Sequence, residues 1–426
     1  MHLFALSCLA SLLSCAAVAA EASHASTTIE KRAVPSGFVT TNGAQFDLDG
    51  EPFYFVGANS FWLPLLLTQD DVDATFQTMQ SAGVQVVRTW AFNAINATEL
   101  PYALESGLTY YQVWNNSDWT LNEGSQGLER LDYVVETAGK YGIRLILTFT
   151  NNWFGYGGAE LYIYHILGNT AITHDEFYTN PTIIASYQRY AQTIVERYKD
   201  SPNVFAWELM NEARCAGDTL PSGPDCVPGS ETLTTWYQLQ SDYVRSLDPY
   251  HMITTGGEGQ YDGTLVSDFN FNGEGRDFEA SLALPNIDFG TYHMYPQTWY
   301  PELDYPGSNF SVEEWGLGWI EAHANTAAYV GKPLLIEEFG VTGLENKTEI
   351  YPVWVGYALA SGHAIEPWQF GELNLTEDGG NRVIKYTDQI YQGASPNDGF
   401  TFYINQTAVW DVFTAAAVVQ GYRSGP

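Results

Sequence analysis

Glu212 and Glu338 are the two acidic residues whose surroundings most clearly suggest chemistry. Each follows a short, mainly apolar run, Val204–Leu209 for the first and Leu334–Glu337 for the second. Such runs predict buried strands. Hydrolysis of a glycosidic bond requires a carboxylic acid that protonates the leaving oxygen and a carboxylate on the other side of the anomeric carbon. If both strands end at the same face of a sheet, these two glutamates would supply that pair.

Two residues close to this pair have side chains that could assist the same reaction. Asn211 directly precedes Glu212, and its amide could donate to a sugar 2-hydroxyl, a contact that strengthens in the transition state. Arg88 is a permanent cation that could hold the carboxylate of Glu338 ionised and oriented. Both residues are therefore predicted at the site.

Three further residues complete the predicted centre. His293 and Tyr295 alternate along the run His-Met-Tyr, so we expect both side chains on one side of a strand. Tyr295 could then donate a hydrogen bond to Glu338, and His293 could tune the pKa of Glu212. Trp368 would form an aromatic floor under the reacting sugar.

Eight short segments rich in apolar, β-branched and aromatic residues are predicted as strands. They are Tyr54–Ala58, Val84–Trp90, Arg144–Thr150, Val204–Leu209, Met252–Gly256, Asp288–Tyr292, Leu334–Glu337 and Ile365–Gln369. Segments with helical spacing lie between them, namely Asp70–Ala82, Gly127–Tyr141, Pro181–Lys199 and Thr232–Leu247. This alternation predicts an α/β protein with a parallel sheet that is either doubly wound or closed.

The turn after the first predicted strand distinguishes these two folds. A doubly wound nucleotide-binding sheet has a glycine-rich turn there, whereas this chain has Ala-Asn-Ser-Phe-Trp-Leu-Pro. The prediction is therefore a (β/α)8 TIM barrel with extended βα loops. Polar residues lie at the end of nearly every predicted strand, and in such a barrel those ends form the catalytic face.

The two ends of the chain and its cysteines indicate export. Residues 1–20 are an apolar run closed by small residues, which predicts a signal peptide. Residues 21–32 end in Lys31-Arg32 and are predicted as a pro-segment, so that 33–426 is a single catalytic domain. Cys215 and Cys226 remain after removal of the signal peptide and are expected to form a disulfide. Six glycosylation sequons favour a secreted, extracellular protein, and they begin at Asn96, Asn115, Asn309, Asn346, Asn374 and Asn405.

The charge of the chain restricts its partners. The formal net charge is −33, with 17 Lys and Arg against 50 Asp and Glu, which excludes nucleic acid and disfavours anionic polymers. Aromatic residues make up 15 %, and aromatic faces grip the C–H surfaces of neutral sugars. The histidines lack metal-ligand spacing, so neither a metal nor another cofactor is expected. We expect a monomer that acts on a neutral polysaccharide and has no membrane partner.

Six motifs of the chain resemble glycoside hydrolase family 5, and within it most closely the fungal endo-β-1,4-mannanases. They are Val86–Phe92, Phe149–Gly158, Trp207–Cys215, Phe289–Trp299, Leu334–Gly340 and Trp368–Gly371. The resemblance implies a (β/α)8 barrel and a retaining double displacement. It also implies that Glu338, rather than the adjacent Glu337, is the nucleophile and that Glu212 is the acid/base. By the same likeness Trp90, Asn152, Arg214 and Trp299 would contact the substrate, with Arg214 towards the leaving group.

The predicted function is hydrolysis of internal β-1,4-mannosidic bonds in mannan, galactomannan or glucomannan. The chain has Ala213 where mannanases usually have proline, and the segment 269–286 departs from the loop expected of them. Another activity of the family therefore remains an alternative: an exo-β-mannosidase, a β-glucanase or a transglycosylase. A catalytically silent sugar-binding barrel would be marked by loss of one glutamate, and both are present.

Overall fold

The computed structural model describes residues 34–168, 172–227, 229–262, 277–376 and 393–424. The predicted signal peptide and pro-segment lie outside the described residues, as does the part of segment 269–286 before Asp277. Residues Pro35–Pro426 form one compact unit, which contains all the helices and strands described here.

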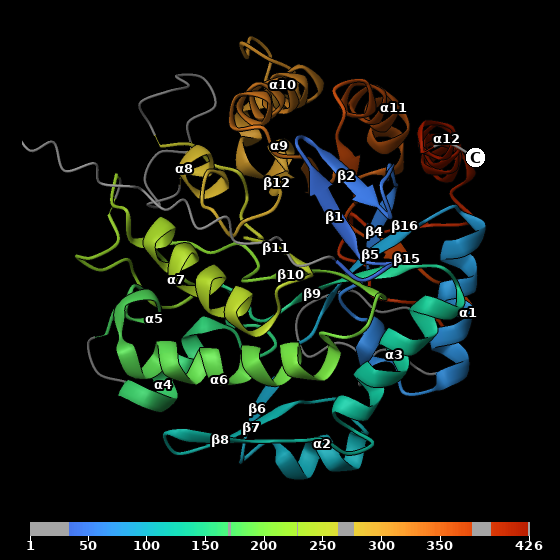
Figure 1. The fold of residues 1–426 in the computed structure, drawn as a ribbon. Coiled ribbons are helices and arrows are strands. Elements are labelled where there is room, and N and C mark those ends of the chain that lie inside the picture. Colours follow the sequence, from blue (N-terminus) through green and yellow to red (C-terminus); the bar gives the residue numbers. More distant parts are fainter. Residues whose placement is uncertain (1–33, 169–171, 228, 263–276, 377–392, 425–426) are drawn as a thin grey trace, which may run out of the picture. The chain divides into compact units, whose positions relative to one another are not determined.

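Eight parallel strands form the centre of the unit (Figure 1). Five of them pair in the order β11–β10–β9–β5–β4, and β12, β13 and β14 pair in a second group. Their bounds are β4 Gly57–Asn59, β5 Val86–Trp90, β9 Arg144–Thr148, β10 Val204–Glu208, β11 Met252–Thr254, β12 Gly290–Met294, β13 Leu334–Phe339 and β14 Ala364–Ile365. A parallel bridge between Val56 and Ile365 joins the two groups on one side. On the other side Asp288 N donates to Ile253 O at 2.9 Å, which closes the (β/α)8 barrel.

All eight predicted segments overlap a strand, but the eighth was placed too far along the chain. The prediction was Ile365–Gln369, whereas β14 ends at Ile365. Pro367 has no N–H to donate to the neighbouring strand, so regular pairing stops before it. Trp368 therefore lies beyond the strand, although its backbone N–H still bonds Phe339 O at 3.0 Å.

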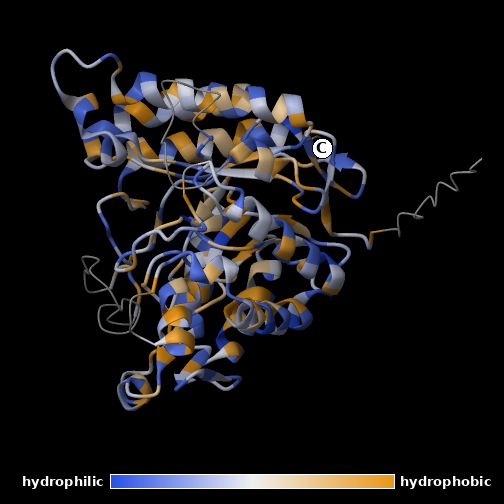
Figure 2. Ribbon diagram, turned by 90° about the vertical axis from the view of Figure 1, so that its left-hand side faces the viewer, coloured by the Kyte–Doolittle hydropathy of each residue, from blue (hydrophilic) through white to orange (hydrophobic). Residues whose placement is uncertain are grey.

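The long helices around the barrel have sequence signals at their ends. In α1 (Gln69–Ser81), the side chain of Thr68 accepts from Asp71 N, as expected of an N-cap. In α10 (Val312–Val330), Ser311 and Glu314 form a capping box, and Gly331 with a φ of 81° ends the helix. The other long helices are α3 Leu128–Lys140, α6 Pro181–Tyr198, α7 Thr232–Leu247, α11 Leu344–Ala360 and α12 Thr407–Arg423. Figure 2 shows hydrophobic and hydrophilic residues alternating along the helices, as expected where one face packs on the barrel.

Shorter elements fill the ends of the barrel and its loops. The antiparallel strands β1 (Val39–Asn42), β2 (Gln45–Leu48) and β3 (Glu51–Pro52) place Phe46 against Phe55, Phe205 and Phe289 in a separate core cluster. The loop after β5 carries β6 Ala94–Asn96, α2 Leu100–Ser106, β7 Gln112–Asn115 and β8 Asp118–Leu121. The remaining short elements are η1 Leu63–Leu65, α4 Ala159–Leu167, α5 Glu176–Thr179, α8 Phe278–Leu282, α9 Pro296–Trp299, η2 Pro301–Asp304, β15 Phe370–Gly371 and β16 Phe402–Tyr403. Extended βα loops are thus present, as predicted.

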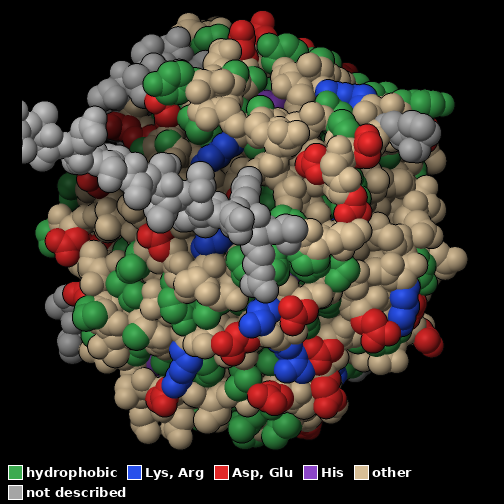
Figure 3. All heavy atoms as spheres, in the orientation of Figure 1, with side chains coloured by type: hydrophobic (Ala, Val, Ile, Leu, Met, Phe, Trp, Pro, Cys, Tyr) green, Lys and Arg blue, Asp and Glu red, His purple; other side chains and the backbone are tan. Residues whose placement is uncertain are grey.

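The surface carries no dominant apolar area on the face drawn in Figure 3, where hydrophobic side chains occur in small groups among charged and polar ones. Within the described ranges, no helix is both long and apolar enough to cross a membrane.

Candidate active site

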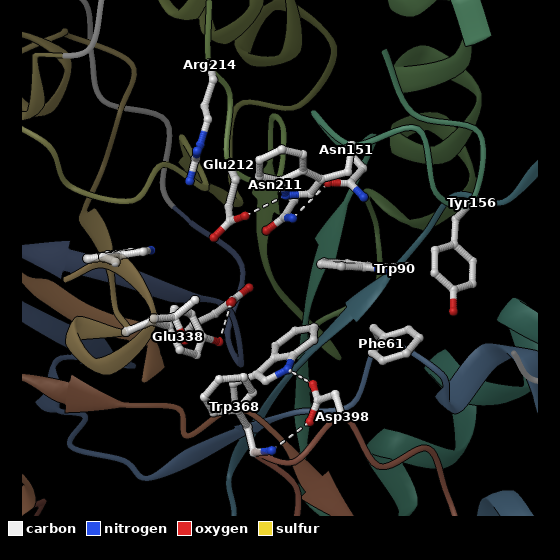
Figure 4. A pocket seen from close by; sticks show the side chains of 15 residues that line it. Phe61, Trp90, Asn151, Tyr156, Asn211, Glu212, Arg214, Glu338, Trp368 and Asp398 are labelled. Atoms are coloured by element: carbon white, nitrogen blue, oxygen red, sulfur yellow. Dashed lines mark hydrogen bonds between the residues drawn. The ribbon is translucent and has the colours of Figure 1, made fainter. Parts of the chain in front are cut away.

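A cavity of about 510 Å³ opens where the carboxyl ends of the strands meet (Figure 4). Eight of the eleven predicted catalytic and substrate-binding residues line it: Trp90, Asn211, Glu212, Arg214, Tyr295, Trp299, Glu338 and Trp368. They come from positions at or just beyond the ends of β5, β10, β12, β13 and β14, because parallel strands bring their carboxyl ends to one face. Most of the residues named from the motifs thus line a single cavity.

The two glutamates face each other across this cavity. One carboxylate oxygen of Glu212, one of Glu338 and one ring nitrogen of His293 all lie within 4.8 Å of one another. Glu212 has a φ of 50°, a left-handed conformation that few residues other than glycine adopt. Such strain persists only where the surroundings hold it, and it is often found at functional sites.

Glu338 is held by two donors. Tyr295 donates its hydroxyl to Glu338 Oε2 at 2.7 Å, and Arg88 donates Nη1 to Glu338 Oε1. Burial raises the pKa of Glu338 above its ordinary value, against the charges of His293 and Arg88. Two donors aimed at one carboxylate favour its ionised, oriented form.

Arg88 lies beneath the cavity, fully buried. It donates Nε and Nη2 to the carboxylate of Glu208 at 2.6 and 2.7 Å, and Nη2 also bonds Asn211 Oδ1 at 2.7 Å. Burial alone would lower the pKa of Arg88, but Glu208 and the neighbouring carboxylates raise it well above its usual value. The predicted contact with Glu338 is present, whereas the side chain has no access to the cavity and cannot touch a substrate itself.

His293 also lies beneath the cavity, between carboxylates. Its Nδ1 is 2.8 Å from Glu212 Oε1, and its Nε2 is 3.2 Å from Glu337 Oε2. Burial would lower the pKa of His293, but the charges of Glu338, Glu212 and Glu337 raise it to about 10. The surrounding carboxylates thus favour the protonated form of His293, whose ring bonds Glu212 and Glu337 and does not line the cavity.

Glu212 is surrounded by donors. Trp153 Nε1 donates to Glu212 Oε2 at 2.6 Å, opposite the bond from His293. Burial would raise the pKa of Glu212, but His293, Arg214 and Trp153 lower it to about 2. Such strongly coupled groups titrate as a pair.

Aromatic rings form one wall of the cavity. The rings of Phe61 and Trp368 stack with centroids 5.6 Å apart and planes 8° apart, and Trp90 lies 6.0 Å from Phe61. Tyr156 meets Phe61 edge-on at 5.5 Å. Figure 4 shows these rings grouped on one side of Glu338. Trp90 and Trp368 were predicted. Tyr156 lies within the motif Phe149–Gly158 and Phe61 lies in the turn after the first predicted strand, but neither was named as a cavity residue.

Arg214 lines another part of the cavity wall. It makes a two-bond ion pair with the buried Glu258, at 2.8 and 2.5 Å, and its guanidinium carbon lies 4.7 Å from the Trp153 ring centroid. The expected disulfide between Cys215 and Cys226 follows it and closes the loop after β10. Glu258 was not predicted at the site, because it lies in a glycine-rich loop without a recognised motif.

The prediction that Asn152 contacts substrate is wrong. Asn152 is fully buried, and its Oδ1 accepts from Arg214 N at 3.0 Å while its Nδ2 donates to Ala216 O at 3.2 Å. The neighbouring Asn151 lines the cavity instead and accepts from Asn211 Nδ2 at 2.8 Å. Consecutive residues at a strand end point to opposite sides, and the motif alone did not tell which one faces inward.

Comparisons with known proteins show which family the chain resembles. The sequence model described as cellulase (glycosyl hydrolase family 5) matches residues 46–373. The probable mannan endo-1,4-beta-mannosidase A of Aspergillus flavus is 37% identical over 389 residues, which are 90% of this chain and 88% of that protein. Mannan endo-1,4-beta-mannosidase F of Aspergillus clavatus is 39% identical over 378 residues, covering 87% of this chain and 76% of that one.

A solved structure extends the likeness to three dimensions. The endo-1,4-beta-mannanase from Rhizomucor miehei superimposes with a TM-score of 0.76 at 33% identity, covering 90% of this chain and 99% of that chain. A family 5 mannosidase from the same organism, at 19% identity and a TM-score of 0.69, shares the fold. With the family model covering most of the barrel and fungal relatives aligned along nearly the whole chain, this protein is a glycoside hydrolase that belongs to glycosyl hydrolase family 5.

Proposed function

We propose that this enzyme hydrolyses internal β-1,4-mannosidic bonds of mannan, galactomannan and glucomannan with retention of configuration. The separation of the two carboxylates carries the proposal, because oxygens of Glu212 and Glu338 lie within 4.8 Å of each other. Retaining glycosidases have carboxyl groups about 5–5.5 Å apart, whereas inverting enzymes leave about 6.5–9.5 Å for a water molecule. The substrate follows from relatives that are named as mannan endo-1,4-beta-mannosidases.

In the first step Glu338 attacks the anomeric carbon. A bond forms between one Glu338 oxygen and that carbon as the bond to the leaving oxygen breaks, and Glu212 gives its proton to that oxygen. Arg88 and Tyr295 fix the direction of the attacking carboxylate. In the second step Glu212 takes a proton from water, whose oxygen displaces Glu338 and restores the original configuration.

The proton for the first step is held by the Glu212–His293 pair. The two groups are joined by one hydrogen bond of 2.8 Å, so a short transfer along it converts Glu212 into the acid. The pair holds the same single proton before and after this transfer, and the leaving oxygen then receives it from Glu212. His293 thus acts as a positioning and charge-setting residue.

Replacement of His293 by asparagine is expected to narrow the pH profile of kcat/KM, with the acidic limb moving to higher pH and the alkaline limb moving to lower pH. The charge of His293 lowers the pKa of both Glu338 and Glu212. Without it, Glu338 ionises at higher pH, which raises the acidic limb. The acid proton is then bound by Glu212 alone instead of being shared with His293, so it is lost at lower pH and the alkaline limb falls.

Tyr295→Phe is the matched control, since it removes a neutral donor from Glu338 alone. It should raise the acidic limb and leave the alkaline limb in place. An alkaline limb that stays unmoved in His293→Asn would refute the link between His293 and the acid.

The substrate is tested by product release from galactomannan, a soluble cellulose derivative, xylan and laminarin, measured side by side. We expect manno-oligosaccharides of mixed length from galactomannan and little from the other three. Release of mannose alone would indicate an exo-β-mannosidase, and release from a glucan would indicate a β-glucanase. Longer products than the starting oligosaccharides would indicate transglycosylation. Each of these results keeps the two-glutamate chemistry and changes the substrate.

We also propose that the enzyme is secreted as a glycosylated monomer whose mature chain begins near Ala33. The disulfide fits an oxidising compartment. Four of the six sequon asparagines are exposed, namely Asn115, Asn309, Asn374 and Asn405. Asn346 is half-buried in α11 and donates to Thr342 O, so glycosylation there is disfavoured. N-terminal sequencing and mass mapping of the exported protein test these points, and a chain that still begins at Met1 would contradict them.

A further inference from the structure

Asp398 lines the cavity beside Trp368 and was assigned no role by the motifs or the proposed chemistry. Its Oδ2 accepts from the indole Nε1 of Trp368 at 2.5 Å and from Nε2 of Gln369 at 3.2 Å. Its Oδ1 accepts from the backbone N–H groups of Phe400 and Thr401 at 2.9 and 3.3 Å. Figure 4 shows Asp398 below the Trp368 ring, joined to it by the indole bond.

The two carboxylate oxygens thus have separate tasks. Oδ1 closes the turn from Asp398 to Thr401, where the Thr401 hydroxyl adds a further bond at 3.2 Å. Oδ2 faces side chains only. Both oxygens are occupied by donors, so a sugar hydroxyl would have to displace one of these bonds to reach the carboxylate. This arrangement suits a residue that holds other groups in place.

The bond to Trp368 fixes the direction of the ring. An indole has one donor and no acceptor, so a single charged acceptor sets the rotation of its ring about the bond to the backbone. Phe61 stacks against the same ring at 5.6 Å and holds its plane. Together Asp398 and Phe61 leave Trp368 one orientation toward the cavity.

The same turn also reaches the nucleophile. Phe400 packs edge-on against Tyr295 with ring centroids 5.1 Å apart, and Tyr295 donates to Glu338. Gly340 provides the space for this contact, because a Cβ there would lie 2.7 Å from the Phe400 ring. At the far end of the turn the buried Lys347 donates Nζ to Thr401 O at 2.8 Å.

We infer that Asp398 is a positioning residue that orients Trp368 as the platform for the reacting sugar and, through Phe400, supports Tyr295 beside Glu338. The inference rests on the proposed function insofar as Trp368 carries a sugar. It does not depend on which β-glycan that sugar belongs to.

Asp398→Asn separates the two tasks of the carboxylate. The remaining oxygen can still close the turn. The new NH2 group faces the N–H of Trp368 and the amide NH2 of Gln369, and because all three are donors, neither hydrogen bond can form. Loss of a hydrogen bond to a charged group corresponds to a decrease in kcat/KM of about 10- to 100-fold. Asn397→Ala is the matched control, because Asn397 Oδ1 accepts from Gly399 N within the same turn and makes no bond to Trp368. It should stay within about twofold of the wild type, as surface changes usually do.

A double-mutant cycle with Trp368→Phe gives the decisive readout, because phenylalanine keeps a ring and lacks the indole N–H. If Asp398 acts through Trp368, Asp398→Asn changes kcat/KM by less than about threefold in the Trp368→Phe background. An equal loss in both backgrounds, or a loss of less than about twofold in the wild-type background, would overturn the inference. Should Asp398→Asn fold poorly in thermal unfolding, Asp398→Ser, whose hydroxyl can also close the turn, replaces it with the same two outcomes.

The cycle is measured on whichever polysaccharide the wild-type enzyme cleaves, so a wrong substrate assignment leaves it readable. Failure of the proposed site would show separately, as a Trp368→Phe variant with unchanged kcat/KM.

Discussion

Replacement of Glu338 by alanine is expected to lower kcat on β-mannan by about 10^4-fold or more, the size of effect that follows removal of a nucleophile. Water cannot take the place of the carboxylate, because a water molecule is neither held at the anomeric carbon by the protein chain nor negatively charged. The fold should survive, since Arg88 keeps its two bonds to Glu208 and burial already disfavours the charged form of Glu338. Steady-state assays together with circular dichroism measure both effects.

Azide identifies the face from which Glu338 acts. In Glu338→Ala an azide ion can enter the space of the lost carboxylate and attack from that side, which gives an α-mannosyl azide. Glu337→Gln is the control, because Glu337 lies behind His293 outside the cavity wall. It should yield no azide product. A Glu338→Ala enzyme with more than a few per cent of wild-type activity would remove this residue from the role.

Replacement of Glu212 by alanine should have an effect that depends on the leaving group. On β-mannan we expect a loss of about 10^2- to 10^4-fold, the usual contribution of a general acid–base group. A dinitrophenyl mannoside needs no proton to leave, so its first step should remain fast. The second step should be slow, because no base activates the water. Pre-steady-state kinetics should therefore show a burst of dinitrophenolate followed by slow turnover.

Azide serves as the second readout for Glu212→Ala. An anion needs no base, so azide should restore turnover and give a β-mannosyl azide, opposite in configuration to the product from Glu338→Ala. If the activated substrate were hydrolysed as poorly as β-mannan and azide gave no rescue, Glu212 would not be the acid/base.

The barrel was predictable because its strands are buried on both faces and therefore stand out as apolar runs between amphipathic helices. The end of the last strand was not predictable from the sequence. Pairing there depends on Pro367 and on the position of the hydrogen-bond acceptors of the neighbouring strand. Motifs at strand ends identified Glu212, Tyr295 and Glu338, because parallel strands bring those positions together regardless of the conformation of the loops.

Residues outside strand ends were not predictable in the same way. Asp398 stands 30 positions after Trp368, and only tertiary packing brings the two into contact. Glu208 was overlooked because its role is to balance Arg88 inside the barrel, a pairing that sequence spacing does not reveal. The choice between Asn151 and Asn152 depended on which side chain the local backbone turns inward.

The most direct test of the mechanism is to trap the covalent intermediate. A 2-deoxy-2-fluoro-mannoside with a good leaving group slows both steps through its fluorine, but its leaving group keeps the first step fast enough for the glycosyl–enzyme to accumulate. Proteolysis and mass spectrometry then locate the added sugar. The structure predicts a single adduct on the peptide that contains Glu338, with loss of activity in proportion to labelling. An adduct on Glu212 or elsewhere, or inactivation without any adduct, would contradict the double displacement proposed here.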